Sequence, residues 1–216
     1  MILGLIGMSC AGKSYWGLRL KEAGFRAWEC DELLAAHLGA ALGLPGMTMP
    51  EAGQWLGLPD TAGYAERERL YLECEAVALE QMVSEAIATI PSGVPMVLDM
   101  GGSAIYVRPD LFATMRRFAT LVYLDIVPEV RAQMLSDYMA APRPLIWHGA
   151  FRPHEGESRT ATFARCYNDL LDERATRYSA LAHVQIPYAL HRRPGLSPAE
   201  LLDHIARVRP ASPVEI

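Results

Sequence analysis

The sequence predicts an α/β fold of three layers, in which helices cover both faces of a mainly parallel, five-stranded sheet. Short apolar runs alternate with longer amphipathic segments, and the first apolar run passes through a glycine-rich turn into a helix. The chain has 216 residues, which is enough for one compact domain and few for two. We therefore expect residues 1–216 to form a single domain.

Five apolar runs predict the strands, and the amphipathic segments between them predict the helices. The first strand, Ile2–Ile6, precedes a helix at Lys13–Ala23, which Gly24 ends. The other strands are expected at Phe25–Trp28, Val94–Asp99, Thr120–Asp125 and His183–Ile186. The other helices are expected at about 31–42, 64–90, 109–118, 128–138 and 162–182.

The last helix has a well-marked beginning at Ser197-Pro198-Ala199-Glu200. A capping serine, a proline in the first turn and a glutamate three residues after the serine satisfy the free amides of a helix start. Two stretches are instead rich in glycine, proline and polar residues, namely Gly43–Gly63 and about 140–161. We expect both to be long loops, and we expect the second to act as a lid over about 140–163.

The composition narrows the classes of function and the compartment. The net charge is −5 without a basic block, so we expect no nucleic-acid partner. The four cysteines lie far apart without a C-x-x-C pair, which is typical of reduced thiols in the cytoplasm. The apolar N-terminal run lacks a cationic region and a cleavage site, and no apolar stretch is long enough to span a bilayer, so we expect no membrane association.

A phosphate-binding loop follows the first strand directly. Gly7-Met8-Ser9-Cys10-Ala11-Gly12-Lys13-Ser14 satisfies G-x-x-x-x-G-K-[ST] and opens a helix, as the chemistry of that motif requires. Backbone amides and the helix N-terminus can bind the β-phosphate, Lys13 can reach the β- and γ-phosphate oxygens, and the Ser14 hydroxyl can ligate Mg²⁺. The motif predicts a P-loop NTPase fold that binds ATP and Mg²⁺.

Acidic residues follow the second and third predicted strands. Glu29 and Asp31 come after the second strand, and Asp99 ends the third in the manner of a Walker B aspartate. Magnesium needs such carboxylates, and transfer to an alcohol needs a group that orients the hydroxyl and accepts its proton. An alternative is that Asp31 only caps the next helix and that Glu29 is only solvated.

Further motifs follow the phosphate loop in a recognisable order. They are Glu29-Cys30-Asp31, Gly101-Gly102-Ser103, Arg143-Pro144-Leu145-Ile146 and the helix from Tyr167 to Tyr178, which contains Arg174. They resemble the D-x-D, G-G-G, R-P-L-L and Y-x-x-L-L-x-x-R-x-x-x-Y motifs of shikimate kinase and its relatives within the nucleoside-monophosphate-kinase group. The resemblance spans most of the chain.

The resemblance implies a role for each matching residue. Lys13, Asp31 and Arg143 would be catalytic, and Ser14, Glu29 and Asp99 would serve the metal. Asp31, Arg67, Gly101, Gly102 and Arg174 would bind the acceptor, within a segment of about 31–75 and the later motifs. The nucleotide would contact Gly7, Ser9, Cys10, Ala11, Gly12, Lys13, Ser14 and Tyr15, together with Arg193 and Pro194, which resemble the segment that lines the adenine.

The chain also departs from the family pattern. The motif F-R-x-x-E finds its nearest counterpart at Tyr64–Glu68, where the carboxylate-binding arginine has become Ala65 and where Arg67 or Arg69 is the candidate replacement. Ser103 stands at the third glycine, and the adenine-stacking arginine after the fourth strand has no match. The lid is roughly a dozen residues longer than the resemblance implies.

We therefore expect an enzyme that transfers the γ-phosphoryl group of ATP to a hydroxyl of a small polar metabolite that carries a carboxylate, with shikimate as the leading acceptor. One alternative is a kinase for another hydroxylated acceptor, such as a sugar acid or an antibiotic. A second alternative is a regulatory module that binds nucleotide without catalysis. We expect a monomer or a weak homodimer.

Overall fold

The computed structural model describes residues 1–141 and 143–208. Pro142, which belongs to the expected lid, and residues 209–216, at the end of the expected domain, lie outside the described residues. Within the described chain, none of the helices combines the length and the apolar character that crossing a bilayer requires.

A single five-stranded sheet forms the centre of the fold. Its strands are β1 (Ile2–Ile6), β2 (Arg26–Glu29), β3 (Met96–Asp99), β4 (Thr120–Leu124) and β5 (Val184–Ile186). They are parallel throughout and lie in the order β2-β3-β1-β4-β5. All residues of β3 and β4 are buried, which is why these strands read as continuous apolar runs.

Helices connect the strands in the expected alternation. They are α1 (Lys13–Glu22), α2 (Cys30–Leu42), α3 (Met49–Leu56), α4 (Tyr64–Thr89), α5 (Pro109–Phe118), α6 (Pro128–Ala140), α7 (Arg159–Leu181), α8 (Tyr188–His191) and α9 (Pro198–Val208). Two short 3₁₀ turns, η1 (Ile90–Ser92) and η2 (Ala104–Tyr106), precede β3 and α5.

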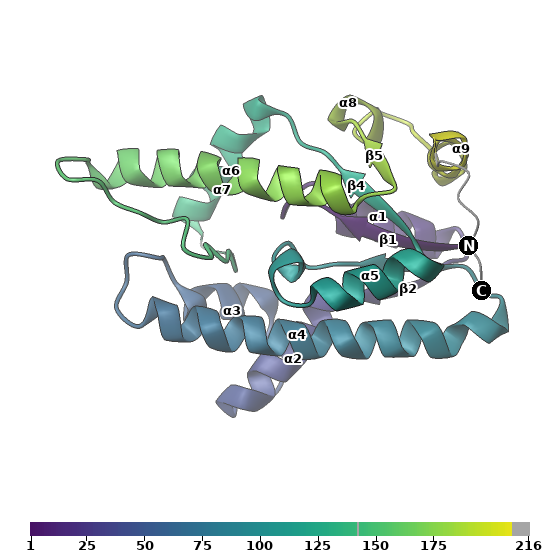
Figure 1. Ribbon diagram of the computed structural model, residues 1–216, viewed down its shortest axis with the longest axis horizontal. Coiled ribbons are helices and arrows are strands. Elements are labelled where there is room, and N and C mark those ends of the chain that lie inside the picture. Colours follow the sequence, from purple (N-terminus) through teal and green to yellow (C-terminus); the bar gives the residue numbers. More distant parts are fainter. Residues whose placement is uncertain (142, 209–216) are drawn as a thin grey trace.

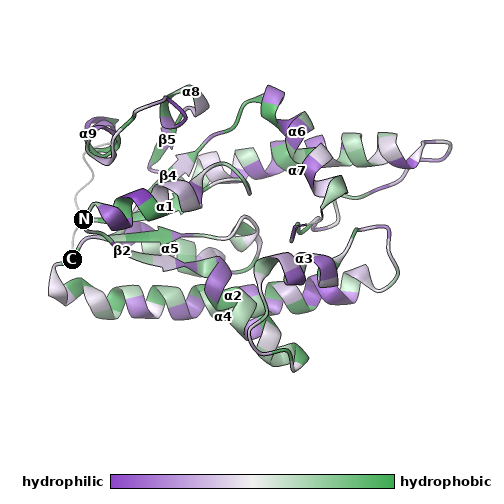
Figure 2. Cartoon of the chain, turned by 180° about the vertical axis from the view of Figure 1, so that it is seen from behind, coloured by the Kyte–Doolittle hydropathy of each residue, from purple (hydrophilic) through white to green (hydrophobic). Residues whose placement is uncertain are grey.

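The helices form the outer two layers. α1 covers one face of the sheet, while α5 and α7 cover the other (Figures 1 and 2). The strands lie inside, and the hydropathy colours show that most helices carry both apolar and polar residues (Figure 2). The three-layer α/β fold predicted from the sequence is confirmed.

The element boundaries agree with the expected ones to within three residues, with two omissions, α3 and the short α8. The stretch 43–63 was expected to be a loop, yet it contains α3. Thr48 caps this helix: its side chain accepts from the Glu51 amide, and the Glu51 carboxylate accepts from the Thr48 amide at 2.8 Å. The pattern Thr48-Met49-Pro50-Glu51 has the same capping signature as the start of α9, so the signal was present in the sequence.

The sheet brings the acidic strand ends together. Glu29 and Asp99 are paired in register at the ends of β2 and β3, and Leu5 of β1 pairs with Asp99 on the other side. The carboxyl ends of the three strands therefore meet beside the loop that follows β1, which is where ligands bind in open parallel sheets.

Candidate active site

The loop between β1 and α1 has the shape that a phosphate group requires. Gly7, Cys10 and Gly12 have φ angles of 144°, 65° and 104°, in the region that favours glycine. A Cβ on Gly7 would lie 2.7 Å from the carbonyl oxygen of Leu124, so only glycine fits there. The buried Lys13 ammonium donates to the carbonyl oxygens of Gly7 and Met8, both at 3.1 Å, and is thereby held over the loop.

The groups suited to a magnesium ion lie next to this loop. The Ser14 hydroxyl donates to Oδ2 of Asp99 at 2.7 Å. Burial raises the pKa of Asp99, while Lys13 and the Ser14 hydroxyl lower it. Burial also raises the pKa of Glu29, and Glu32 and Asp99 raise it further. A hydroxyl and carboxylate oxygens are the ligand types that Mg²⁺ prefers, so these residues fit the ion.

A cavity of about 590 Å³ opens from the phosphate loop toward α4 and α7. It brings together most of the residues expected from the sequence, namely Ser9, Cys10, Gly12, Lys13, Ser14, Tyr15, Asp31, Gly102, Arg143 and Arg174. Ser103, Pro144 and Ile146, which belong to the expected glycine and lid motifs, also line it. The lining residues that the sequence did not assign to the site are Met49, Pro50, Tyr71 and Arg192. Gly7 and Ala11 are buried within the loop, and Gly101 lies buried behind Gly102.

A second cavity of about 470 Å³ adjoins the first. The two share Ser14, Asp31 and Met49, and the second is also lined by Glu29 and Asp99. Asp31 thus lies where the two cavities meet. Its side chain is solvent-accessible through the cavities although protein surrounds it, and this burial raises its pKa, which Lys13 lowers and Asp99 raises.

Asp31 does not cap α2. The N-cap residue is Glu29, which makes no side-chain capping bond, and Asp31 lies in the first turn. Its carboxylate instead approaches the glycine pair: Oδ1 lies 3.2 Å from the position that a Cβ on Gly101 would occupy. The capping alternative is therefore not supported.

Arg174 is a buried guanidinium on the acceptor side of the cavity, with 1% of its surface exposed. Its Nη2 donates to the carbonyl oxygen of Ile146 at 2.6 Å, and its Nε donates to the Tyr106 hydroxyl at 3.3 Å. It forms no ion pair with a carboxylate of residues 1–141 or 143–208, and Nη1 lies 3.5 Å from the Cβ position of Gly102. This leaves Nη1 available for an anionic or polar group of a ligand.

Two arginines from distant segments contact the phosphate loop. Arg143, in the lid, directs Nη1 to the Cys10 sulfur at 3.1 Å. Arg192, which follows α8, donates from Nη2 to the Cys10 carbonyl oxygen at 2.9 Å. Positive charge therefore reaches the loop at Cys10 from two distant segments, where it can meet a phosphate chain.

The expected adenine-side pair lies elsewhere. The Arg193 guanidinium pairs with Glu200 at 2.6 Å, and neither Arg193 nor Pro194 lines the cavity. Arg192, the residue before them, does. The sequence could not separate two adjacent arginines, because only the end of α8 determines which one faces the loop.

Arg67 is not an acceptor ligand in this structure. Its guanidinium donates to the carbonyl oxygens of Leu56 and Ala62 at 2.9 and 3.0 Å and to the Thr61 hydroxyl at 2.9 Å, so it stabilises the loop between α3 and α4. Arg69 forms an exposed pair with Glu73. Neither arginine takes the place of the carboxylate-binding arginine for which Ala65 stands in the resembling motif.

The face of α4 that meets the cavity lies two turns after the expected motif. Tyr71 lines the cavity, and Oε1 of Glu75 lies 2.5 Å from the Cβ position of Gly101. These two residues repeat the aromatic-x-x-x-Glu spacing of Tyr64 and Glu68 seven residues later, on the same helix face. In this register, Leu72 stands at the position of the carboxylate-binding arginine of the resembling motif, and it carries no charge.

The long lid is packed rather than open. Trp147 is buried, with its ring centroid 5.5 and 5.6 Å from those of Phe151 and Phe163. Oε1 of Glu68 accepts from the amides of Trp147 and His148 at 2.7 and 2.9 Å, which joins the lid to α4.

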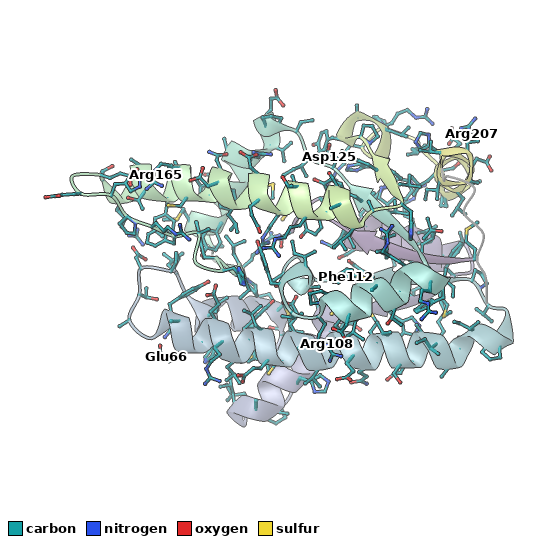
Figure 3. The ribbon with its side chains drawn as sticks, in the orientation of Figure 1. Glu66, Arg108, Phe112, Asp125, Arg165 and Arg207 are labelled. Carbon is teal, nitrogen blue, oxygen red and sulfur yellow. The ribbon has the colours of Figure 1, made fainter. Side chains whose placement is uncertain are left out.

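At the far end of the lid, Arg165 on α7 (Figure 3) joins the loop to the helix. It pairs with Glu157 at 2.6 Å and donates to the carbonyl oxygen of Arg152 at 2.8 Å. The aromatic residues of the inserted segment therefore pack the lid, and His148 stacks on Tyr106, while the His154 side chain is exposed.

Solved shikimate kinases have the same architecture across nearly the whole chain. Shikimate kinase from Acinetobacter baumannii in complex with shikimate has a TM-score of 0.55 and 21% identity, over 95% of this chain and 90% of that one. Shikimate kinase from Bacteroides thetaiotaomicron has a TM-score of 0.56 and 15% identity, over 96% and 98%. No protein-family model and no curated protein matches the sequence. The chain thus has the P-loop kinase fold of shikimate kinases, and at these identities its function must be argued from the site.

Proposed function

We propose that this protein is a kinase that transfers the γ-phosphoryl group of ATP to a hydroxyl of a small polar metabolite. The observation that carries the proposal is the shared cavity: Lys13 on the phosphate loop, Asp31 and Arg174 all line it. A nucleotide site and an acceptor site that open into one space can align a phosphoryl group with a hydroxyl, and such positioning is most of the catalysis in phosphoryl transfer. We further propose that residues 1–216 act as one such domain, as a monomer or a weak homodimer.

Each residue has a role in this proposal. The phosphate-loop amides and Lys13 bind the triphosphate, and Arg143 and Arg192 neutralise charge on it. Asp31 orients the acceptor hydroxyl and accepts its proton. Ser14, Asp99 and Glu29 hold Mg²⁺, which supplies charge neutralisation on the phosphate oxygens.

Shikimate is our leading acceptor, since one structural neighbour is a shikimate kinase in complex with shikimate. Arg174 supplies one guanidinium for a carboxylate, and a second is missing because Leu72 stands at the position of the carboxylate-binding arginine. Sugar acids and antibiotic hydroxyls are therefore the alternative acceptors, which the same chemistry can serve.

The direct test is ADP release from ATP·Mg²⁺ by the purified protein with a panel of hydroxylated acids, including shikimate. We expect turnover with at least one acceptor and a low background rate without any. Nucleotide binding without acceptor-dependent ADP release across the panel would instead support the regulatory module.

A further inference from the structure

Ser103 and Glu75 lie together beneath the acceptor side of the cavity. Ser103 is 5% exposed and lines the cavity, at the position where the resembling family has a glycine. Glu75 is fully buried behind it, and neither of its oxygens has a regular hydrogen bond within the described chain. Burying a carboxyl without a hydrogen-bond partner destabilises the folded state, so the presence of Glu75 at this position needs an explanation.

The acceptor side is also poor in positive charge. Within the described chain, the cations that line the cavity are Lys13, Arg143, Arg174 and Arg192. Lys13 belongs to the phosphate loop, and Arg143 and Arg192 contact Cys10 in it. Only Arg174 is left for the acceptor, so recognition there must depend more on uncharged hydrogen bonds than on a pair of guanidinium groups.

Burial raises the pKa of Glu75 to about 8, although the nearby Ser103 hydroxyl favours the ionised form and lowers it. The carboxyl is therefore neutral at pH 7 and has a proton to donate. The titratable and charged groups that influence Glu75 or are influenced by it are Lys13 of α1, Cys30 and Asp31 of α2, Tyr71 of its own helix, and Arg174 and Tyr178 of α7.

We propose that Ser103 is a specificity-determining residue whose hydroxyl, oriented by Glu75, donates a hydrogen bond to an uncharged oxygen of the acceptor. The inference rests on the proposed kinase function and identifies the class of acceptor. That class is an alcohol that carries a second hydroxyl, ether or carbonyl oxygen facing the Gly102–Ser103 turn. Its binding does not require two arginines to hold one carboxylate.

The direction of the hydrogen bonds follows from the protonation of Glu75. While the carboxyl is neutral it donates to Ser103 Oγ, which leaves the Ser103 proton free for the acceptor. Once it ionises, it can only accept, and it competes for that same proton. Acceptor binding should therefore weaken as the pH rises through about 8.

The first experiment needs no turnover. In protein labelled with ¹³C at the glutamate carboxyls, one signal should titrate near pH 8 and disappear in Glu75→Gln. Ser103→Ala should raise that pKa, because it removes the hydroxyl that lowers it. Shikimate and its methyl ester are the probes, and binding of either should shift this signal in the native protein but not in Ser103→Ala.

The second experiment measures KM for the same two probes. Ser103→Ala should raise KM about tenfold for both with little change in kcat, the loss expected for one buried hydrogen bond. The rise in KM above about pH 8 should vanish in Glu75→Gln, whose amide donates at every pH. The matched controls are Ser179→Ala and Glu80→Gln, both exposed.

The outcomes separate the two proposals. An ordinary pKa for Glu75, no shift of its signal with either probe, or an unchanged KM in Ser103→Ala would overturn the role of Ser103. Binding of a probe that shifts the Glu75 signal, without any ADP release, would overturn phosphoryl transfer and leave the recognition by Ser103 supported.

Discussion

The two halves of the cavity are built in different ways. The phosphate half comes mainly from one continuous segment, Gly7–Ser14, whose groups are mostly backbone amides and carbonyls, and to which Arg143 and Arg192 add charge. The acceptor half comes from α2, α3, α4, the turn before η2, the lid and α7, and its groups are side chains. The first half depends on local conformation, and the second on how distant elements pack.

This difference explains how chemistry and specificity are divided. A loop of amides binds any triphosphate of the right geometry and changes little with the identity of single side chains. The acceptor half changes with single side chains, as Ser103 illustrates, because each side chain that lines it contributes a separate contact. Substitutions that separate the two halves are therefore the most informative.

Asp31→Asn should have the largest effect on turnover, because Asp31 aligns the acceptor hydroxyl with the phosphate half of the cavity. We expect kcat to fall about 10³-fold, the contribution of a positioned general base, with little change in nucleotide affinity. Rapid-quench kinetics and titration with a fluorescent ADP analogue measure these quantities. Glu32→Gln, the adjacent carboxylate, is the control, and equal losses in both variants would contradict the role of Asp31.

Arg174→Lys should damage only the acceptor half. A lysine keeps the charge but cannot reproduce the donors to Ile146 and Tyr106, so we expect the acceptor KM to rise about 30-fold while the ATP KM stays constant. Arg177→Lys, one turn later and exposed, is the control. An equal change in both KM values would mean that the two halves are not separate.

Glu68→Ala tests whether the lid belongs to the acceptor half. It removes the acceptor of the Trp147 and His148 amides, which should lower the free energy of unfolding by about 1–2 kcal/mol and speed amide exchange in the lid. Denaturant titration and hydrogen-exchange mass spectrometry report these effects. Glu66→Ala, at the exposed start of α4 (Figure 3), should change neither.

Arg192→Met should have a smaller effect, confined to the phosphate half. Loss of its contact with the loop should raise the ATP KM about fivefold, as for one exposed charged hydrogen bond. Arg193→Met should leave this KM unchanged, because Arg193 pairs with Glu200 at the surface. A larger rise in the ATP KM for Arg193→Met than for Arg192→Met would instead support the nucleotide contact that the sequence predicts for Arg193.

The sequence predicts the phosphate half of the cavity better than the acceptor half. The strands, most helices and the phosphate loop were predictable because their signals are local: apolar periodicity, caps and a contiguous motif. The acceptor side was partly misread. Arg67 was expected in the site because Tyr64–Glu68 matches a motif, while Tyr71 and Glu75 repeat the same spacing two turns later. Only the packing of α4 against the glycine turn distinguishes the two registers.

The conformation of the phosphate loop has a practical consequence for chemical labelling. All four cysteines lie in the described chain, and Cys30, Cys74 and Cys166 are buried, whereas Cys10 is exposed in the loop. A maleimide should therefore alkylate Cys10 first, since thiol accessibility governs such selectivity. A bound triphosphate would shield that sulfur, so the rate of alkylation would report fractional occupancy without an engineered reporter group.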